Sequence, residues 1–419
     1  MESHKELWQN RRSMNRFGFK NVPRVVWGIF FVTLVVNCGN YMAQFMSIFF
    51  TNKLGITPNY SGIYVSLAGM AFLPGSLAGG KLSDVWGKKK VFLTFQGLAI
   101  VVTLLNMFIF SKAVTPILFI LNALFVAATI PVYNSTIFEV SDNDNKKDCL
   151  SLFFVGMNIG NMVSSIIGAA FFSKHYQLLF GAEVIMKILS IIIFYSFVNY
   201  DAPKKPHQAE IEEEAANEKE KSMWSVLFKY PTLLLFSLSC CLFSIILSQN
   251  TYALPIHLDA VFGDLGTTYY GIVLGINAFV IVIGTSTINS LTRKYEKLNL
   301  LLIATALVGC GFGLIYFGQF FGIYIITTLL WSSSDILNTP NSSAYISEFA
   351  PPDMLGRFAA WIKIVTGAGY AIGPIAIGFI IDHKGSRIVF PILFAIAVIN
   401  FILLMFIKNM EKTEKGKNQ

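Results

Sequence analysis

Long apolar runs alternate with short polar stretches along this chain of 419 residues. A helix needs about 20 apolar residues to cross the hydrocarbon of a bilayer. Twelve runs are that long: 25–50, 60–80, 91–110, 115–138, 150–172, 178–198, 231–256, 268–291, 298–318, 321–346, 358–381 and 388–407. Membrane β-strands would be shorter and would alternate in polarity. The pattern therefore predicts twelve transmembrane helices, six on each side of a polar centre.

Composition supports this placement in lipid. Hydrophobic residues make up 54% of the chain and charged residues only 13%, against about a quarter charged in soluble proteins. The five cysteines show no CxxC or Cys/His spacing, so the sequence supports no metal site and no disulfide framework. We expect an all-α membrane protein without a cofactor. Its net charge of +8 is expected to reflect basic loops and no nucleic-acid partner.

The distribution of basic residues orients the predicted helices. Most of the 32 Lys and Arg residues lie in the N-terminal segment and in loops on its side of the membrane, and basic loops face the cytoplasm. We therefore predict a plasma-membrane protein with both termini in the cytoplasm. The expected parts are a cytoplasmic N-terminal segment (1–24), a six-helix bundle (25–198), a charged cytoplasmic linker (199–230), a second six-helix bundle (231–407) and a cytoplasmic tail (408–419).

An internal repeat relates the two halves. One constant offset superposes Pro131 on Pro340, Glu139 on Glu348 and Lys88 on Lys297. Such an offset, held across several helices, indicates a duplication. Two parallel halves with a substrate site at mid-depth between them characterise one large class of transporters. The two bundles are therefore expected to be pseudo-symmetric.

The loop after the run 60–80 carries a recognisable motif. It reads GKLSDVWGKKK from Gly80 to Lys90 and resembles the G-x-L-[AS]-D-R-x-G-R-[RK] signature of the major facilitator superfamily. The twelve runs and the repeat extend the resemblance over the whole chain. The stretches 254–258 (LPIHL) and 335–340 (DILNTP) are similar to bacterial drug:proton antiporters of the lactococcal multidrug type. The resemblance implies a secondary active transporter that alternates access between its two bundles.

The motif implies a gate. In the superfamily, the carboxylate equivalent to Asp84 braces the second helix against the eleventh and closes the cytoplasmic side. Asp84 could accept hydrogen bonds at a helix N-terminus, and glycine allows close approach and tight turns. The gate residues are then Gly80, Leu82, Asp84, Gly87, Lys88 and Lys89. The alternative is that this basic loop only anchors the topology.

Asp335 is the leading candidate for proton coupling, because it lies near the middle of the run 321–346. Burial in apolar surroundings disfavours a charged carboxylate, which can then exchange a proton near neutral pH. The resemblance implicates this position in protonation and in binding of cationic substrates. Trp331 and Asn338 would share its helix face. The alternative is a fixed salt bridge to Lys363 or Lys187.

Three further acids lie in or at the ends of predicted helices. Glu139 and Glu348 occupy equivalent repeat positions near the inner face. The resemblance makes Glu139 a candidate for proton release or for a relay with the Asp84 loop, and Glu348 joins the proton-coupling candidates as its equivalent in the repeat. Alternatively, each ties its loop to a basic neighbour such as Lys147 or Arg357. Glu183 is expected to form a structural pair with Lys187, four residues further along one helix.

Polar residues in the first and seventh runs are candidates to line the cavity, since the resemblance places these helices around it. They are Asn37, Asn40, Tyr41, Gln44, Gln249, Asn250 and Tyr252. Amides are expensive in lipid, so each should face a wet cavity or another helix. Hydrogen bonding between helices is the alternative to substrate contact.

The predicted function is proton-coupled efflux of amphipathic compounds, with a small-molecule substrate, protons and the bilayer as partners and with the monomer as the working unit. Antiporters of this type carry a Gly-Pro pair in the fifth helix, whereas here Asn161 follows Gly160, and Gly373-Pro374 lies in the run 358–381. A carrier for a metabolite, nutrient or lipid, or a non-transporting sensor, therefore stays open. No nucleotide-binding loop or nucleophile triad is found, so an enzyme is not predicted.

Overall fold

The computed structural model describes residues 22–142, 145–198, 231–292, 294–350 and 355–417, and its regular elements are helices. The predicted linker 199–230 and most of the predicted N-terminal segment lie outside the described residues. The first half contains α2 (Arg24–Cys38), α3 (Tyr41–Gln44), α4 (Met46–Ile48), the π-helix η1 (Phe49–Lys53), α5 (Pro58–Trp86), α6 (Lys88–Phe108), α7 (Val114–Val140) and α8 (Lys146–Phe197).

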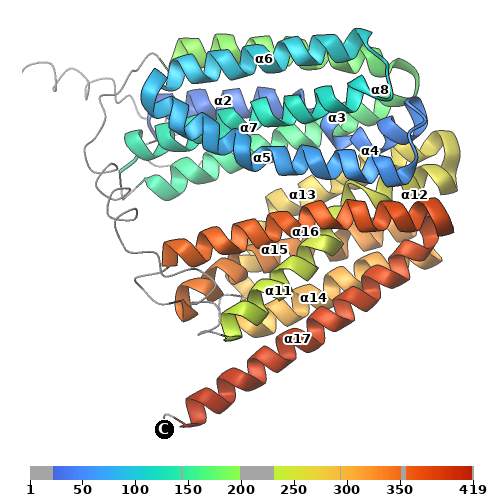
Figure 1. The fold of residues 1–419 in the computed structure, drawn as a ribbon. Coiled ribbons are helices and arrows are strands. Elements are labelled where there is room, and N and C mark those ends of the chain that lie inside the picture. Colours follow the sequence, from blue (N-terminus) through green and yellow to red (C-terminus); the bar gives the residue numbers. More distant parts are fainter. Residues whose placement is uncertain (1–21, 143–144, 199–230, 293, 351–354, 418–419) are drawn as a thin grey trace, which may run out of the picture.

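The second half repeats this order. It contains α11 (Pro231–Leu247), the 3-10 helix η2 (Ser248–Asn250), α12 (Ala253–Phe262), η3 (Gly263–Leu265), α13 (Gly266–Thr292), α14 (Lys297–Leu314), η4 (Ile315–Phe317), α15 (Phe321–Phe349), α16 (Leu355–Lys384), η6 (Ser386–Ile388) and α17 (Val389–Lys417). The two halves form two helical bundles that lie side by side with their helices roughly aligned (Figure 1).

The twelve predicted spans are present in these helices. Eight stretches of the described residues are long and apolar enough to cross a membrane, and two of them, 148–197 and 231–285, each hold two spans. The first span begins in the shorter apolar helix Arg24–Cys38. The tenth is α15, whose length suffices but whose middle is rich in Ser, Thr and Asn. The fold class is therefore an all-α membrane protein with twelve helices in two pseudo-symmetric bundles.

The repeat extends to individual helix ends. Helices α6 and α14 begin at Lys88 and Lys297, the residues that the constant offset pairs. Helices α7 and α15 each contain the matched proline, Pro131 and Pro340. The duplication predicted from a few residues thus holds for the local structure around them.

The prediction of continuous helices at 25–50 and 231–256 is wrong. Helix α2 ends at Cys38 and α11 ends at Leu247, and the offset that pairs Pro131 with Pro340 also pairs these two residues. Side-chain amides bond to the main chain beside both interruptions: Asn37 Nδ2 donates to the Thr33 carbonyl (2.7 Å) and Gln249 Nε2 to the Ile245 carbonyl (3.0 Å). Such bonds offer the backbone an alternative to the helical pattern. Both bundles therefore contain a helix broken at the same place.

The runs 150–172 and 178–198 were predicted as two helices and are joined here without a loop. The chain is helical from Lys146 to Phe197, and only His175, with φ −135° and ψ 38°, departs from helical geometry. The two spans of α8 meet at this kink.

Candidate functional site

The two bundles touch mainly through two helix pairs, α5 with α16 and α8 with α13, and also where α4 meets α12. We call the end where α8 stops and α11 starts the linker end, and the opposite end the far end. A Cβ added to Gly62 of α5 would collide with the Pro374 carbonyl of α16, and one added to Gly271 of α13 would collide with Ala169 of α8. These glycines, equivalent in the repeat, lie in the far halves of their helices. Their lack of a side chain lets the bundles meet there.

Four hydrogen bonds join the bundles within the described residues, and in each a hydroxyl donates to a main-chain carbonyl. They run from Ser47 Oγ to Thr251 (3.0 Å), from Tyr270 OH to Gln44 (3.3 Å), from Ser66 Oγ to Ala371 (2.5 Å) and from Tyr252 OH to Pro58. Three of the four involve the broken helices. The far end is therefore closed by small residues and hydroxyl groups, and no ion pair crosses between the bundles in the described chain.

At the linker end, side chains of α5 and α16 are exposed. Val85 and Trp86 are 77% and 47% exposed, and Ile364 is 52% exposed. The described residues make no hydrogen bond or ion pair with Asp84, which is itself exposed. The bundles thus meet at the far end and not around Asp84.

The motif loop has the tight turn predicted for it. Gly87 has φ 85°, which strongly favours glycine, and it joins α5 directly to α6. Leu82 packs against the core of the first bundle, and the nearest atom to a Cβ on Gly80 would be Pro131 Cβ at 3.8 Å. Lys89 Nζ lies 3.7 Å from the centre of the Tyr195 ring.

The two acids at the ends of α7 and α15 are paired in the same way. Lys88 Nζ lies 2.6 Å from Glu139 Oε2, and Lys297 forms the equivalent ion pair with Glu348. The sequence suggests Lys147 or Arg357 as partners. The structure instead pairs the two acids with Lys88 and Lys297. Glu139 is thereby tied to the loop that carries Asp84.

Asp335 lies near the middle of α15 and is partly exposed. Its Oδ1 accepts a hydrogen bond from Thr339 Oγ1 (3.1 Å), one turn along the same helix. The fixed salt bridge that the sequence left open is not formed with either lysine. Lys187 is engaged by Glu183, and Lys363 is exposed without an ion pair to the described residues. Asp335 has no cationic partner in the described chain.

The two residues predicted to share a face with Asp335 have different surroundings. Trp331 is 1% exposed and lies 6.3 Å from Phe312 between ring centres, so it is packed between α14 and α15. Asn338 is partly buried, and its Oδ1 accepts a hydrogen bond from Ser342 Oγ (3.3 Å). Only Asp335 and Asn338 are therefore partly accessible in this conformation.

Most candidate cavity residues of the broken helices are engaged within the protein. Gln44 bonds to Ser164 (2.7 Å) and Ser165 (2.5 Å) on α8, which is the interhelical alternative that the sequence left open. Tyr41, Gln249 and Tyr252 are almost completely buried. The three asparagines of the candidate set, Asn37, Asn40 and Asn250, keep partial exposure.

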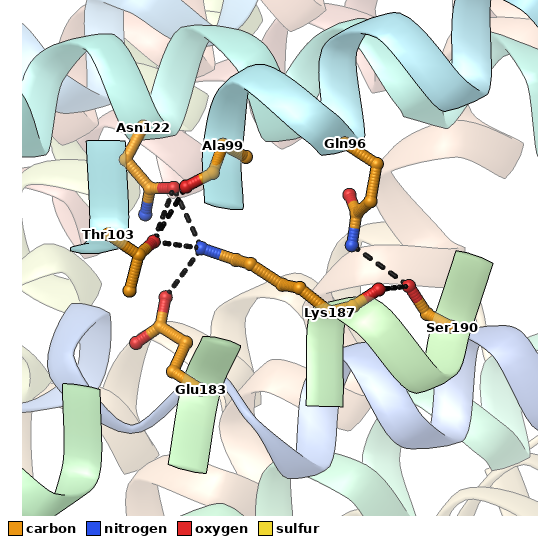
Figure 2. A network of polar contacts seen from close by, with 7 residues as sticks. All are labelled: Gln96, Ala99, Thr103, Asn122, Glu183, Lys187 and Ser190. Carbon is orange, nitrogen blue, oxygen red and sulfur yellow. Dashed lines mark hydrogen bonds and ion pairs between the residues drawn. The ribbon is translucent and has the colours of Figure 1, made fainter. Parts of the chain in front are cut away.

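The predicted Glu183–Lys187 pair is present, at 2.8 Å. The sequence did not reveal its neighbours Thr103 and Asn122, which come from α6 and α7 (Figure 2). It also missed the closing hydroxyls of Ser47, Ser66 and Tyr270. The aligned glycines Gly62 and Gly271 were the available signal for that contact.

Known proteins support this architecture. The sequence profile of the Major Facilitator Superfamily matches residues 29–362 and 336–419. The MFS-type transporter YqjV of Bacillus subtilis is 20% identical over 414 residues, covering 96% of this chain and 98% of that protein. A Na(+), Li(+), K(+)/H(+) antiporter of Planococcus maritimus is 21% identical over 370 residues, covering 80% and 84%.

Solved transporters share the fold. A peptide transporter, POT, in complex with sulfate is similar with a TM-score of 0.75 and 14% identity, covering 97% of this chain and 98% of its own. The nucleoside transporter NupG is similar with a TM-score of 0.73 and 14% identity, covering 91% and 99%. With the profile spanning nearly all of the sequence, the chain belongs to the Major Facilitator Superfamily and is a multi-pass membrane transporter.

Proposed function

We propose that this transporter couples the export of amphipathic compounds to proton entry, with Asp335 as the group that binds a proton or a cationic substrate. The observation that carries the proposal is that Asp335 has no cationic partner among the described residues while it lies mid-helix in α15. A carboxylate held only by Thr339 is free to exchange a proton or to bind a cation. Ionisable residues inside membrane helices commonly mark such pathways.

The proposal also assigns the orientation of the protein in the membrane and the state of its transport cycle. If the linker end faces the cytoplasm, as the basic loops favour, the closed far end faces outward and the protein is inward-facing here. Asp84 is then a gate residue that is exposed and makes no gate contact with the described part of the second bundle in this conformation. The gate would form when the linker end closes and α5 approaches the start of α16. Asn37, Asn40, Asn250 and Asn338, which keep partial exposure, are the polar groups available to a substrate on that path.

The export of monovalent cations in exchange for protons is the second candidate. It is favoured by the relative from Planococcus maritimus, whose name describes a Na(+), Li(+), K(+)/H(+) antiporter. Asp335 would serve this exchange equally, because a carboxylate binds either a proton or a small cation.

Everted membrane vesicles separate the two candidates. We expect amphipathic dyes and lipophilic cations, added to energised vesicles, to dissipate a pH gradient in wild type and not in Asp335→Asn. Sodium, lithium or potassium would do so instead if the second candidate is correct. Thr339→Val is the matched control, since it removes the hydrogen bond to Asp335 but keeps the carboxylate. Equal responses from wild type and Asp335→Asn to every compound would refute the role of Asp335.

A further inference from the structure

A second group of buried ionisable side chains lies inside the first bundle. Glu183 and Lys187 of α8 are 3% and 4% exposed, and their charged groups are 2.8 Å apart. Lys187 Nζ also donates to Thr103 Oγ1 of α6 (2.6 Å) and to Asn122 Oδ1 of α7 (2.8 Å) (Figure 2). The ammonium has three donors, and each has an acceptor on a separate side chain. The lysine is therefore completely satisfied.

The carboxylate of Glu183 is only half satisfied. Its Oε2 is buried without a hydrogen-bond partner in the described chain, and Asn106 Oδ1 is in the same condition. Thr103 and Asn106 are three residues apart on α6, so they share a face. Helix α6 runs away from the linker end and the second half of α8 runs toward it. Asn106 and Glu183 are therefore each one turn nearer the far end than Thr103 and Lys187. Two buried acceptor oxygens in this part of the first bundle thus lack a donor among the described residues, and a proton on Glu183 would supply one.

Stability alone does not account for this pair. The desolvation of two buried charges offsets much of their attraction, and replacing such pairs with apolar residues is often neutral or stabilising. An ionisable residue inside a membrane helix is instead a candidate functional group. The orphaned oxygen of Glu183 makes it the member of the pair that can accept a proton.

The pair lies beside the broken helix that closes the far end. Helix α3, which begins with Tyr41, packs against α8, and a Cβ on Gly39, just before it, would lie 2.6 Å from Met186 Cβ, three residues from Glu183. Beyond Tyr41, the main chain at Gln44 accepts from Tyr270, and Ser47 donates to Thr251. A change of charge at Glu183 therefore acts next to a segment that holds the bundles together.

We propose that Glu183 is a second proton-binding site, and that its charge state biases closure of the far end through the Tyr41 segment. The proton binds to Oε2 while Lys187 stays an ammonium, so the pair changes from neutral to a single positive charge. Among the described residues, Lys187 is the charged group in contact with Glu183, and Tyr41 is the titratable side chain of the neighbouring α3; α6 and α7 contribute the neutral Thr103, Asn106 and Asn122. The inference rests on the proposed proton coupling and adds a site distinct from Asp335.

A cysteine reporter at the far end tests the proposal. Ala169 is 5% exposed and lies against Gly271, so Ala169→Cys should react with a membrane-impermeant maleimide only when the far end opens. The reporter is placed in a full-length protein whose five native cysteines are replaced. Rates between about pH 5 and pH 9 are divided by those of Asn52→Cys, an exposed position at the same end, to remove the pH dependence of the thiol.

We expect two pH-dependent steps in the normalised rate, each a several-fold change. Asp335→Asn should remove one step and Glu183→Gln the other. Glu183→Gln with Lys187→Met, which removes both charges of this pair, should lack the Glu183 step as well and covers the case in which the single variant does not fold. If this double variant keeps both steps, the pair is only structural and the inference is wrong. If Asp335→Asn keeps both steps, it is the proposed function that fails.

Discussion

Lys88 and Glu139 form an ion pair of 2.6 Å that joins the start of α6 to the end of α7. Lys297 and Glu348, their equivalents in the repeat, join α14 to α15 in the same way. Each pair lies within one bundle, so it can persist while the bundles move relative to each other. The first pair also fixes the base of the Asp84 loop. We infer that both pairs hold the linker ends of the bundles rigid.

Reversing the first pair tests this role. Because the Lys88 and Glu139 side chains are 17% and 25% exposed, we expect either single charge removal to cost about 1 kcal/mol or less of unfolding free energy. The exchange Lys88→Glu with Glu139→Lys should recover part of that loss, as measured by thermal unfolding in detergent. A double variant that is less stable than both single variants would contradict the pairing.

The contact between Gly62 and Pro374 predicts a conformational block. Gly62→Leu places a side chain where a Cβ already collides with the Pro374 carbonyl, so the far end should be unable to close. We expect substrate transport to be lost while the protein still inserts and folds, with the Ala169→Cys reporter modified several-fold faster than in wild type. Gly69→Leu is the matched control, because a Cβ there meets nothing within 4 Å. Transport by Gly62→Leu at the wild-type rate would rule out this closing contact.

The hydroxyl of Tyr252 predicts a smaller effect at the same end. Tyr252→Phe removes the bond to the Pro58 carbonyl but keeps the packed ring. A single hydrogen bond contributes about 0.5–1.5 kcal/mol, so the closed population should fall by a few-fold. The same maleimide measurement reads this shift. An unchanged rate in Tyr252→Phe would mean that the hydroxyl does not contribute to closure.

The buried Glu183–Lys187 pair predicts that removing the lysine alone destabilises the protein more than removing both charges. Lys187→Met leaves Glu183 buried without its cation, so the carboxylate must stay as an unpaired charge or take up a proton, at a cost of up to about 3–5 kcal/mol. Adding Glu183→Gln removes the charge and should restore much of the loss. Thermal unfolding of the three proteins in one detergent checks this order. A double variant as unstable as Lys187→Met would show that the charges are not coupled.

The architecture could be predicted from the sequence because membrane helices are recognisable as apolar runs of about 20 residues. The constant offset that pairs Lys88 with Lys297 also pairs the first residues of α6 and α14. The interruptions after Cys38 and Leu247 could not be predicted, since the apolar runs continue through them and the competing amides of Asn37 and Gln249 bond locally.

Side-chain partners were harder to predict than helices. Glu183 and Lys187 could be paired because they are four residues apart on one helix. Thr103 and Asn122 belong to other helices, and their approach to Lys187 depends on how α6, α7 and α8 pack. The same limit explains why Asp335 could be singled out by its depth, whereas the burial of Trp331 against Phe312 could not.

The central claim is that Asp335 exchanges the proton that drives transport while the two bundles alternate. Purified protein in proteoliposomes tests it most directly, with an exported uncharged amphipathic compound measured under an imposed pH gradient and without one. We predict that Asp335→Asn abolishes accumulation driven by the gradient, while exchange of substrate across the membrane at equal pH continues. Accumulation by Asp335→Asn at the wild-type level under the same gradient would contradict the account.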